Sequence, residues 1–186
     1  MKIILASASP RRRELMELAG LPFETDVSDT DESIDGVMAP AEYVEELSSR
    51  KAYAVAGRHP EDIVIGADTV VVYKDIILGK PKDSEDAYRM LKMLSGKTHS
   101  VYTGVTIVRP GNSREPFHDT FHVCTDVVMY DNPDDLLRDY ACSGEPLDKA
   151  GAYGIQGRGS LLIERINGDY YNVVGLPIAE LCRRLR

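Results

Sequence analysis

An anion-binding turn is indicated near the start of the sequence, where residues 7–13 read Ser-Ala-Ser-Pro-Arg-Arg-Arg. A short apolar stretch precedes this turn, and a serine before a proline is typical of the start of a helix. Cations in the first turn of a helix oppose the helix dipole, whereas an anion held there is favoured by the dipole, by free backbone N–H groups and by the arginines. The segment is either a capped helix with solvated arginines or a phosphate site, and its place between strand and helix favours the phosphate site.

Carboxylates that could bind a metal ion occur in two further segments. Asp68 ends the apolar, strand-like run 63–67, and residues 29–32 read Asp-Thr-Asp-Glu. An Asp at a strand end beside a second carboxylate can hold Mg²⁺ or take a proton from water. Taken alone, the loop 29–32 is more typical of solvent-facing polarity, and Asp68 is equally consistent with a turn residue and a reactive one.

Two glycine-containing segments complete the set of candidate ligand contacts. Residues 79–81 read Gly-Lys-Pro, which either fixes a turn or presents Lys80 to an anion. In the glycine-rich segment 148–157, the glycines would let the backbone approach a ligand, and the Gln156 amide can read a base edge. This segment lacks the Walker spacing, and no G-x-G-x-x-G joins a strand to a helix, which excludes the standard ATPase and dinucleotide sites.

The composition indicates one compact domain over residues 1–186. Of these residues, 43% are hydrophobic, enough to form a core without disulfides or a structural metal. The net charge of −8 argues against a protein that coats nucleic acid or an anionic membrane. The longest apolar runs are strand-sized and no signal-peptide pattern is present, so we expect a cytoplasmic protein. Its three cysteines lack the spacing of a metal site and are expected to be buried thiols.

These residues must be positioned by alternating strands and helices. The patterns predict strands at 2–6, 23–27, 63–73, 76–78, 99–108, 121–129, 161–166 and 170–174, and helices at 10–19, 40–57, 84–94, 132–143 and from 177 onwards. A polar loop is expected around 111–114, and Asn167-Gly168 predicts a two-residue hairpin. The order of elements predicts a mixed α/β fold, a twisted sheet with antiparallel hairpins and flanking helices.

The helical patterns also predict which side chains face the core. In the first helix Leu15, Leu18 and Ala19 share one face. The candidates for the second helix are Tyr43, Val44, Leu47, Tyr53 and Ala54. His99 has no nucleophile context and is expected to be a packed or hydrogen-bonded histidine rather than a catalyst.

Taken together, these segments closely resemble the Maf (septum-formation) family of nucleoside triphosphate pyrophosphatases. The matching segments are 7–12, Glu32, Lys51, 66–69, 79–81, 94–99, 148–157 and 168–177. The resemblance implies a Maf/ITPase-like fold of two lobes around a substrate cleft, with no separable linker. It further implies that the protein uses a divalent cation, Mg²⁺ or Mn²⁺, and cleaves a nucleoside triphosphate to the monophosphate and pyrophosphate. The resemblance also makes a homodimer possible.

The resemblance assigns roles to individual residues. Glu32 and Asp68 would be the catalytic acidic pair and the metal ligands, with Asp68 the proton acceptor. The residues expected to contact phosphate groups are Ser7, Ser9, Arg12, Lys51 and Lys80. The rival hypothesis is a nucleotide-binding regulator of cell division that does not hydrolyse its ligand. Binding a tetraanion gains nothing from extra carboxylates unless a metal and a water are to be positioned, and this favours the enzyme.

Three positions resemble the branch of the family that acts on dTTP and UTP. They are Arg11, Thr69 and Gln156. The branch acting on 7-methylguanosine triphosphate carries Trp, Gln and Glu at the matching places. The resemblance therefore implies pyrimidine triphosphates as substrates, and modified ones such as pseudo-UTP or 5-methyl-UTP would enter the same pocket.

Overall fold

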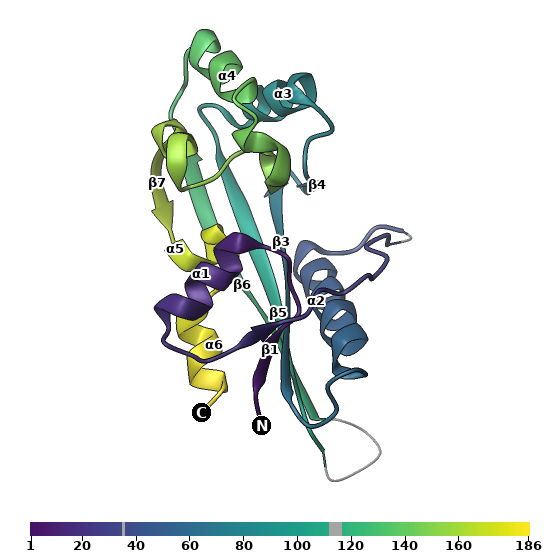
Figure 1. Ribbon diagram of the computed structural model, residues 1–186. Coiled ribbons are helices and arrows are strands. Elements are labelled where there is room, and N and C mark those ends of the chain that lie inside the picture. The colour runs from purple at the N-terminus through teal and green to yellow at the C-terminus, as the bar shows by residue number, and fades with distance from the viewer. Residues whose placement is uncertain (35, 112–116) are drawn as a thin grey trace. The chain divides into compact units, whose positions relative to one another are not determined.

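A computed structural model of the chain describes residues 1–34, 36–111 and 117–186 (Figure 1). The predicted polar loop around 111–114 lies outside these residues except for Gly111. The strands are β1 (Ile3–Leu5), β2 (Glu24–Thr25), β3 (Ile63–Tyr73), β4 (Ile76–Leu78), β5 (Thr98–Arg109), β6 (Phe117–Met129) and β7 (Ile163–Asn167). The α-helices are α1 (Pro10–Leu18), α2 (Pro40–Ala56), α3 (Ser84–Leu94), α4 (Asp134–Ala141), α5 (Tyr170–Val174) and α6 (Ile178–Arg184). The short 3₁₀ segments are η1 (Glu145–Asp148), η2 (Ala150–Ala152) and η3 (Gly157–Leu162).

The strands form one mixed sheet, which confirms the predicted α/β class. Its order is β2-β1-β3-β5-β6-β7, with β4 paired to β3. β1 runs parallel to both β2 and β3, whereas β4 is antiparallel to β3 and β7 is antiparallel to β6. None of the helices in the described part of the chain is long and apolar enough to cross a membrane.

The chain divides into two compact units, and neither is continuous in sequence. Unit 1 comprises residues 1–68, 103–123 and 175–186, and unit 2 comprises residues 69–102 and 124–174. The strands β3, β5 and β6 contribute residues to both units.

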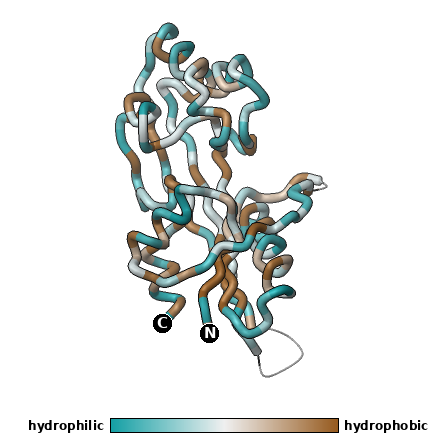
Figure 2. Tube along the Cα trace, in the orientation of Figure 1, coloured by the Kyte–Doolittle hydropathy of each residue, from teal (hydrophilic) through white to brown (hydrophobic). Residues whose placement is uncertain are grey.

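In unit 1, α2 packs directly on the backbone of two strands. Its core includes buried side chains from β1, α2, β3 and β5, and β1 stands out as hydrophobic in Figure 2. A Cβ atom on Gly66 of β3 would lie 2.3 Å from the carbonyl oxygen of Ser48, and one on Gly104 of β5 would lie 2.2 Å from that of Val44. No side chain fits at either point, so the two glycines set how closely α2 approaches the sheet.

The predicted inner faces of α1 and α2 were partly wrong. In α1 the buried residues are Leu15 and Met16, while Leu18 is 64% exposed. In α2, Val44 and Leu47 are buried as predicted, whereas Tyr53 is exposed. Ala54 is exposed as well, and the helix buries Ala52 and Val55 instead.

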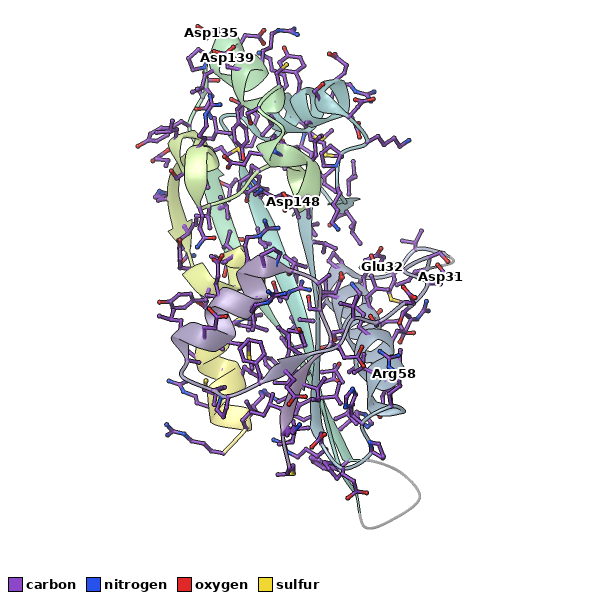
Figure 3. All side chains as sticks on the ribbon, in the orientation of Figure 1. Asp31, Glu32, Arg58, Asp135, Asp139 and Asp148 are labelled. Carbon is purple, nitrogen blue, oxygen red and sulfur yellow. The ribbon has the colours of Figure 1, made fainter. Side chains whose placement is uncertain are left out.

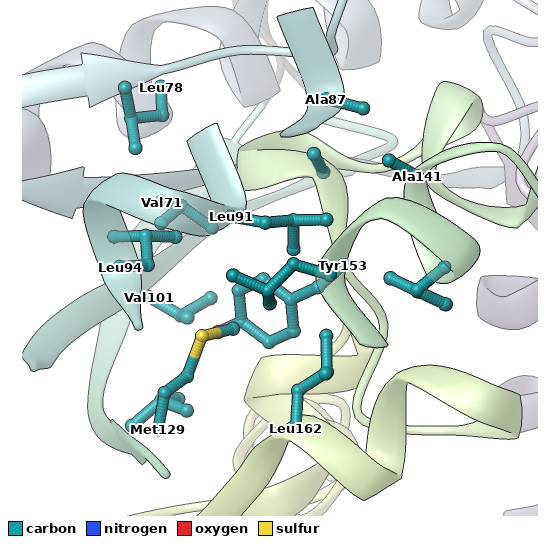
Figure 4. Close-up of a cluster of buried hydrophobic side chains, with 14 residues drawn as sticks. Val71, Leu78, Ala87, Leu91, Leu94, Val101, Met129, Ala141, Tyr153 and Leu162 are labelled. Atoms are coloured by element: carbon teal, nitrogen blue, oxygen red, sulfur yellow. The ribbon is translucent and has the colours of Figure 1, made fainter. Parts of the chain in front are cut away.

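Unit 2 has its own core, formed by side chains of α3, α4 and the neighbouring strands (Figure 4). Leu91, Leu94 and Tyr153 are among its buried members. The β3–β4 hairpin turns at Lys74 and Asp75, both with positive φ, as the sequence predicted. This hairpin and α3, capped by the side chain of Asp83, have the predicted boundaries.

The predicted hairpin at Asn167-Gly168 is wrong, because residues 170–174 form the helix α5 rather than a strand. Asp169 explains the difference. Its backbone N–H donates to the Thr125 hydroxyl at 3.0 Å and its carboxylate accepts from the Tyr171 N–H at 2.8 Å. These bonds fix the chain against β6 and start a helical turn, where a hairpin would need a second strand.

The cysteines also differ from expectation. Cys124 and Cys142 are exposed and Cys182 is partly buried, and all three are free thiols. Cys124 lies on β6, Cys142 follows α4 and Cys182 lies on α6, so none belongs to the buried face of its element.

Candidate active site

The serine-rich turn of unit 1 forms a hydrogen-bonded start to α1. The Ser9 side chain accepts from the Arg12 N–H, and the Ser7 hydroxyl accepts from the Ser9 N–H at 3.2 Å. Proline at the first helical position completes the cap. Both hydroxyls that were predicted to contact phosphate therefore also order the turn.

Arg12 connects this turn to the middle of β3. Its Nε donates to the Gly175 carbonyl and its Nη1 donates to the Ala67 carbonyl, both at 2.8 Å. Burial lowers the pKa of Arg12, and the charge of Asp68 partly offsets that lowering. Arg12 thus holds the residue that directly precedes Asp68, a structural role that the sequence did not predict.

Three predicted site residues meet around one ammonium group, and we call them the Lys51 cluster: Glu32, Lys51 and Asp68. Lys51 Nζ lies 2.6 Å from Asp68 Oδ1 and 2.9 Å from Glu32 Oε1. Lys51 and Asp68 are largely buried, whereas the Glu32 side chain is 61% exposed. Figure 3 labels Glu32 in the segment that leads to α2. The cluster gathers two carboxylates and one cation within a single unit.

The position of Lys51 follows from the packing of α2. Gly66 lies two residues before Asp68, and a Cβ there would be 2.6 Å from the Ala52 backbone nitrogen. The helix therefore touches β3 beside Lys51, which is next to Ala52 in sequence. The close approach at a glycine brings the ammonium to the carboxylate.

Tyr43 is a neighbour that the sequence assigned only to the core. It is partly buried on α2, and its pKa is raised by burial and by the charges of Asp68 and Glu32. The helical spacing of Tyr43 and Lys51, eight residues apart on α2, was the signal that could have identified it, because such residues share one face. Tyr43 therefore adds a phenol to the electrostatic surroundings of the Lys51 cluster.

The two carboxylates of the Lys51 cluster are of the kind that a divalent cation binds. Across residues 1–34, 36–111 and 117–186, no group of three or more His, Cys, Asp or Glu side chains could hold a metal by itself. Glu32 and Asp68, however, direct two hard oxygen donors at one cationic position, now that of the Lys51 ammonium. Mg²⁺ commonly takes one or two carboxylates and completes its shell with phosphate and water.

Two further predicted site residues belong to different units, Arg11 to unit 1 and Thr69 to unit 2. Arg11 lies in the first turn of α1 and is partly buried. Thr69, next to Asp68 on β3, belongs to unit 2 and is partly buried.

Lys80 and Gln156, both in unit 2, lie on segments whose backbones are connected through η2. The Gly151 N–H donates to the Gly79 carbonyl at 3.0 Å. Lys80 is exposed and Gln156 is partly buried. Within the part of the chain that the structure describes, neither side chain has a hydrogen-bond partner.

Two glycines of the segment 148–157 lie close to protein side chains. A Cβ on Gly151 would lie 2.8 Å from Val71 Cγ2, and one on Gly154 would lie 2.8 Å from Lys149 Cε. Gly151 also has a φ of 66°, which favours glycine. These glycines allow a tight fold of the segment itself, and the approach of a ligand expected from sequence stays a prediction.

Comparison with known proteins identifies the family. A solved nucleoside-triphosphatase (dITP/XTP pyrophosphatase) of Mycobacterium abscessus has a TM-score of 0.46 at 15% identity, covering 72% of this chain and 76% of that one. A dTTP/UTP pyrophosphatase of Bacillus cytotoxicus is 52% identical over 185 residues, covering 100% of this chain and 94% of that protein. One of Bacillus cereus is 50% identical with the same coverage. Residues 2–186 match the family described as Maf-like protein. The chain belongs to the Maf family.

Proposed function

We propose that this chain is a nucleoside triphosphate pyrophosphatase that hydrolyses dTTP and UTP to the nucleoside monophosphate and pyrophosphate. The Lys51 cluster carries the proposal, because it joins a buried carboxylate, a second carboxylate and a cation in one place. The names of the two relatives described above support the pyrimidine triphosphates as substrates. Modified pyrimidine triphosphates such as pseudo-UTP or 5-methyl-UTP are further proposed substrates of the same site.

The proposed reaction is attack of water on the α-phosphorus. The new bond joins the water oxygen to phosphorus, the bond from the α-phosphorus to the bridging oxygen breaks, and pyrophosphate leaves with that electron pair. Asp68 accepts the proton of the water. Asp68 lies inside β3 rather than at the strand end that the sequence suggested. Because it is held there and paired with Lys51, its carboxylate is oriented before substrate arrives.

The cations of the chain are proposed to offset the charge of the triphosphate. Arg12, Lys51 and Lys80 would hold phosphate oxygens, and Ser7 and Ser9 would add hydroxyl contacts. Glu32 and Asp68 would hold Mg²⁺ or Mn²⁺, which when bound neutralises phosphate charge and polarises the reacting phosphoryl group.

The base is proposed to be read by Gln156, with Arg11 and Thr69 shaping the pocket. A uracil or thymine ring offers two carbonyl acceptors on either side of one N–H donor, and a glutamine amide supplies both a donor and an acceptor for this pattern. The unpartnered amide of Gln156 among the described residues is consistent with this role.

The wider setting of the enzyme is also a proposal. The free thiols suit a reducing compartment, which supports action in the cytoplasm. The net charge of −8 supports a small-molecule substrate rather than nucleic acid. By family resemblance, we propose that the two lobes form a single enzyme that can act as a homodimer.

A panel of nucleoside triphosphates with Mg²⁺ or Mn²⁺ tests the function, with pyrophosphate and orthophosphate measured separately. We expect pyrophosphate with dTTP and UTP, and ¹⁸O from labelled water in the monophosphate. Orthophosphate and a nucleoside diphosphate as first products would contradict the proposal, and label in pyrophosphate would move the attack to the β-phosphorus. Tight binding of UTP without turnover would favour the rival nucleotide-binding regulator of cell division.

A further inference from the structure

The segment 154–159, which we call the Gln156 loop, is held by two side chains outside it. The Gly154 N–H donates to the Tyr140 hydroxyl oxygen at 3.2 Å. On the other side of Gln156, the N–H groups of Arg158 and Gly159 donate to the Glu145 carboxylate, each at 3.2 Å. Both ends of the loop are therefore anchored, and all of these residues belong to unit 2.

The two anchors are joined to each other. The Tyr140 hydroxyl donates to Glu145 Oε1 at 3.0 Å while accepting from Gly154. Tyr140 is 1% exposed and is part of the unit 2 core, and burial raises its pKa, so its hydroxyl remains a donor. Glu145 is partly buried and begins η1. The carboxylate is thereby tied by a hydrogen bond to a side chain of the unit 2 core.

The shape of the Gln156 loop depends on the same carboxylate. A Cβ on Gly159 would lie 2.3 Å from the Gly154 carbonyl oxygen, so the loop closes on itself. Gly157 has a φ of 65°, and a Cβ there would lie 3.0 Å from Glu145 Oε1. The Glu145 side chain thus lies against the inner backbone of the loop. A neutral amide could not replace it, because one oxygen acceptor and one NH₂ donor cannot take three incoming N–H and O–H donors.

We propose that Glu145, fixed by Tyr140, is a positioning residue that sets the conformation of the Gln156 loop and so the preference of the enzyme for a pyrimidine base. This inference rests on the proposed function, since it assigns to Glu145 the orientation of the residue proposed to read the base. Glu145 acts through Gln156 and itself contacts no substrate.

The test compares Glu145→Gln and Tyr140→Phe with Glu164→Gln, a matched change on β7 of the same unit. For each variant, kcat and KM are measured with UTP and with GTP, in the wild-type and the Gln156→Ala backgrounds. We expect Glu145→Gln to lower the UTP to GTP ratio of kcat/KM about tenfold, mostly through KM for UTP, and Glu164→Gln to change it less than about twofold. In the Gln156→Ala background, Glu145→Gln should change the ratio less than about twofold.

A second measurement reports on the Gln156 loop without relying on enzyme activity. Hydrogen exchange at the amides of Arg158 and Gly159 should become faster in Glu145→Gln and stay unchanged in Glu164→Gln. Tyr140→Phe removes no charge and should act in the same direction with a smaller effect, and it carries the test if Glu145→Gln fails to fold.

Some outcomes would overturn the inference while leaving the enzyme assignment intact. They are an unchanged UTP to GTP ratio in Glu145→Gln, effects of Glu145→Gln and Gln156→Ala that simply add, and unchanged exchange at Arg158 and Gly159. A wild-type chain that hydrolyses no triphosphate would instead overturn the proposed function and the base-reading part of this inference. The exchange data would then still decide whether Glu145 orders the loop.

Discussion

Lys51 donates a hydrogen bond of 2.6 Å to Asp68, and only 12% and 11% of the two side chains are exposed. A charge in such a site requires its partner, because an unpaired buried charge is costly. The pair therefore links the stability of unit 1 to the chemistry proposed for Asp68. The substitutions below separate these two effects.

Asp68→Asn is expected to lower kcat at least about a hundredfold, because the amide preserves the shape but cannot accept a proton. The protein should still fold but unfold at a lower temperature, because the amide no longer offsets the buried charge of Lys51. Pyrophosphate release and thermal unfolding measure the two effects. Asp62→Asn is the control, since Asp62 directly precedes β3 and accepts from the Lys2 N–H. Asp68→Asn activity within a few-fold of wild type would show that the proton acceptor lies elsewhere.

Glu32→Gln is expected to raise the Mg²⁺ or Mn²⁺ concentration needed for half-maximal rate, because a neutral amide is a weaker ligand for a hard cation. The rate is measured against metal concentration at saturating UTP. Asp31→Asn is the matched control, because this neighbouring carboxylate accepts from Ser33 rather than from Lys51. Identical metal titrations for Glu32→Gln and wild type would remove Glu32 from the metal site.

Gly66→Ala is expected to destabilise the protein by about 3 kcal/mol and to lower activity, because the added methyl meets the α2 backbone and forces the helix and Lys51 away from β3. Urea unfolding and kcat measure both effects. Gly57→Ala at the end of α2 serves as control, since the nearest atom to a Cβ there lies 3.9 Å away. Equal stability of the two variants would contradict the proposed packing contact.

His99 should make the protein less stable in acid. It is 3% exposed, its Nε2 lies 2.6 Å from the Tyr153 hydroxyl oxygen, and burial lowers its pKa to about 4, partly offset by Asp126. The unfolded chain binds a proton near pH 6.5 and the folded chain only near pH 4. His99 therefore does not reduce the free energy of unfolding above pH 6.5, and it lowers this free energy by about 3 kcal/mol as the pH drops to 4.

Urea unfolding at several pH values checks this prediction in wild type and in His99→Gln. The variant should lose less stability than wild type between pH 6.5 and 4, because it has no imidazole to protonate. His118→Gln, at an exposed position, should keep the wild-type pH dependence. The same slope in wild type and His99→Gln would assign the acid sensitivity to other groups.

Gln156→Glu is expected to lower kcat/KM for UTP and dTTP by roughly 5- to 150-fold, because the change removes the NH₂ donor and sets a negative charge against a pyrimidine carbonyl. A 7-methylguanine ring carries N–H donors and a positive charge, so 7-methyl-GTP should lose less or gain. The preference ratio of the two substrates is the measurement. If that ratio did not change, base reading would rest on Arg11 and Thr69.

The elements with strong local signals were predictable from sequence. The runs Ile63–Tyr73 and Ser84–Leu94 have the predicted boundaries because each has an unambiguous period and a clear end signal, such as the Asp83 cap. The segment 170–174 was not predictable in the same way. Its helical start depends on Asp169 bound to Thr125, 44 residues away, which no local pattern contains.

The sequence predicted which residues form the candidate site better than it predicted how these residues are arranged. The motifs indicated Lys51 and Asp68. Their contact depends on Gly66, which has no side chain and therefore lets α2 come close to β3. The sequence predicted no role for Glu145, because a single glutamate in an irregular segment has no periodicity. Its importance follows only from the backbone N–H groups of Arg158 and Gly159 that reach it in the fold.

The Arg12–Gly175 hydrogen bond has a consequence for synthesis on the ribosome. The two residues are 163 positions apart, so a nascent chain carries Arg12 without this acceptor until residue 175 has emerged. Unit 1 also needs residues 175–186, which are made after all of unit 2. Arg12, which also holds the Ala67 carbonyl beside Asp68, therefore completes its hydrogen bonds only after residue 175 has emerged, and a chain that ends before this residue lacks the Arg12–Gly175 bond.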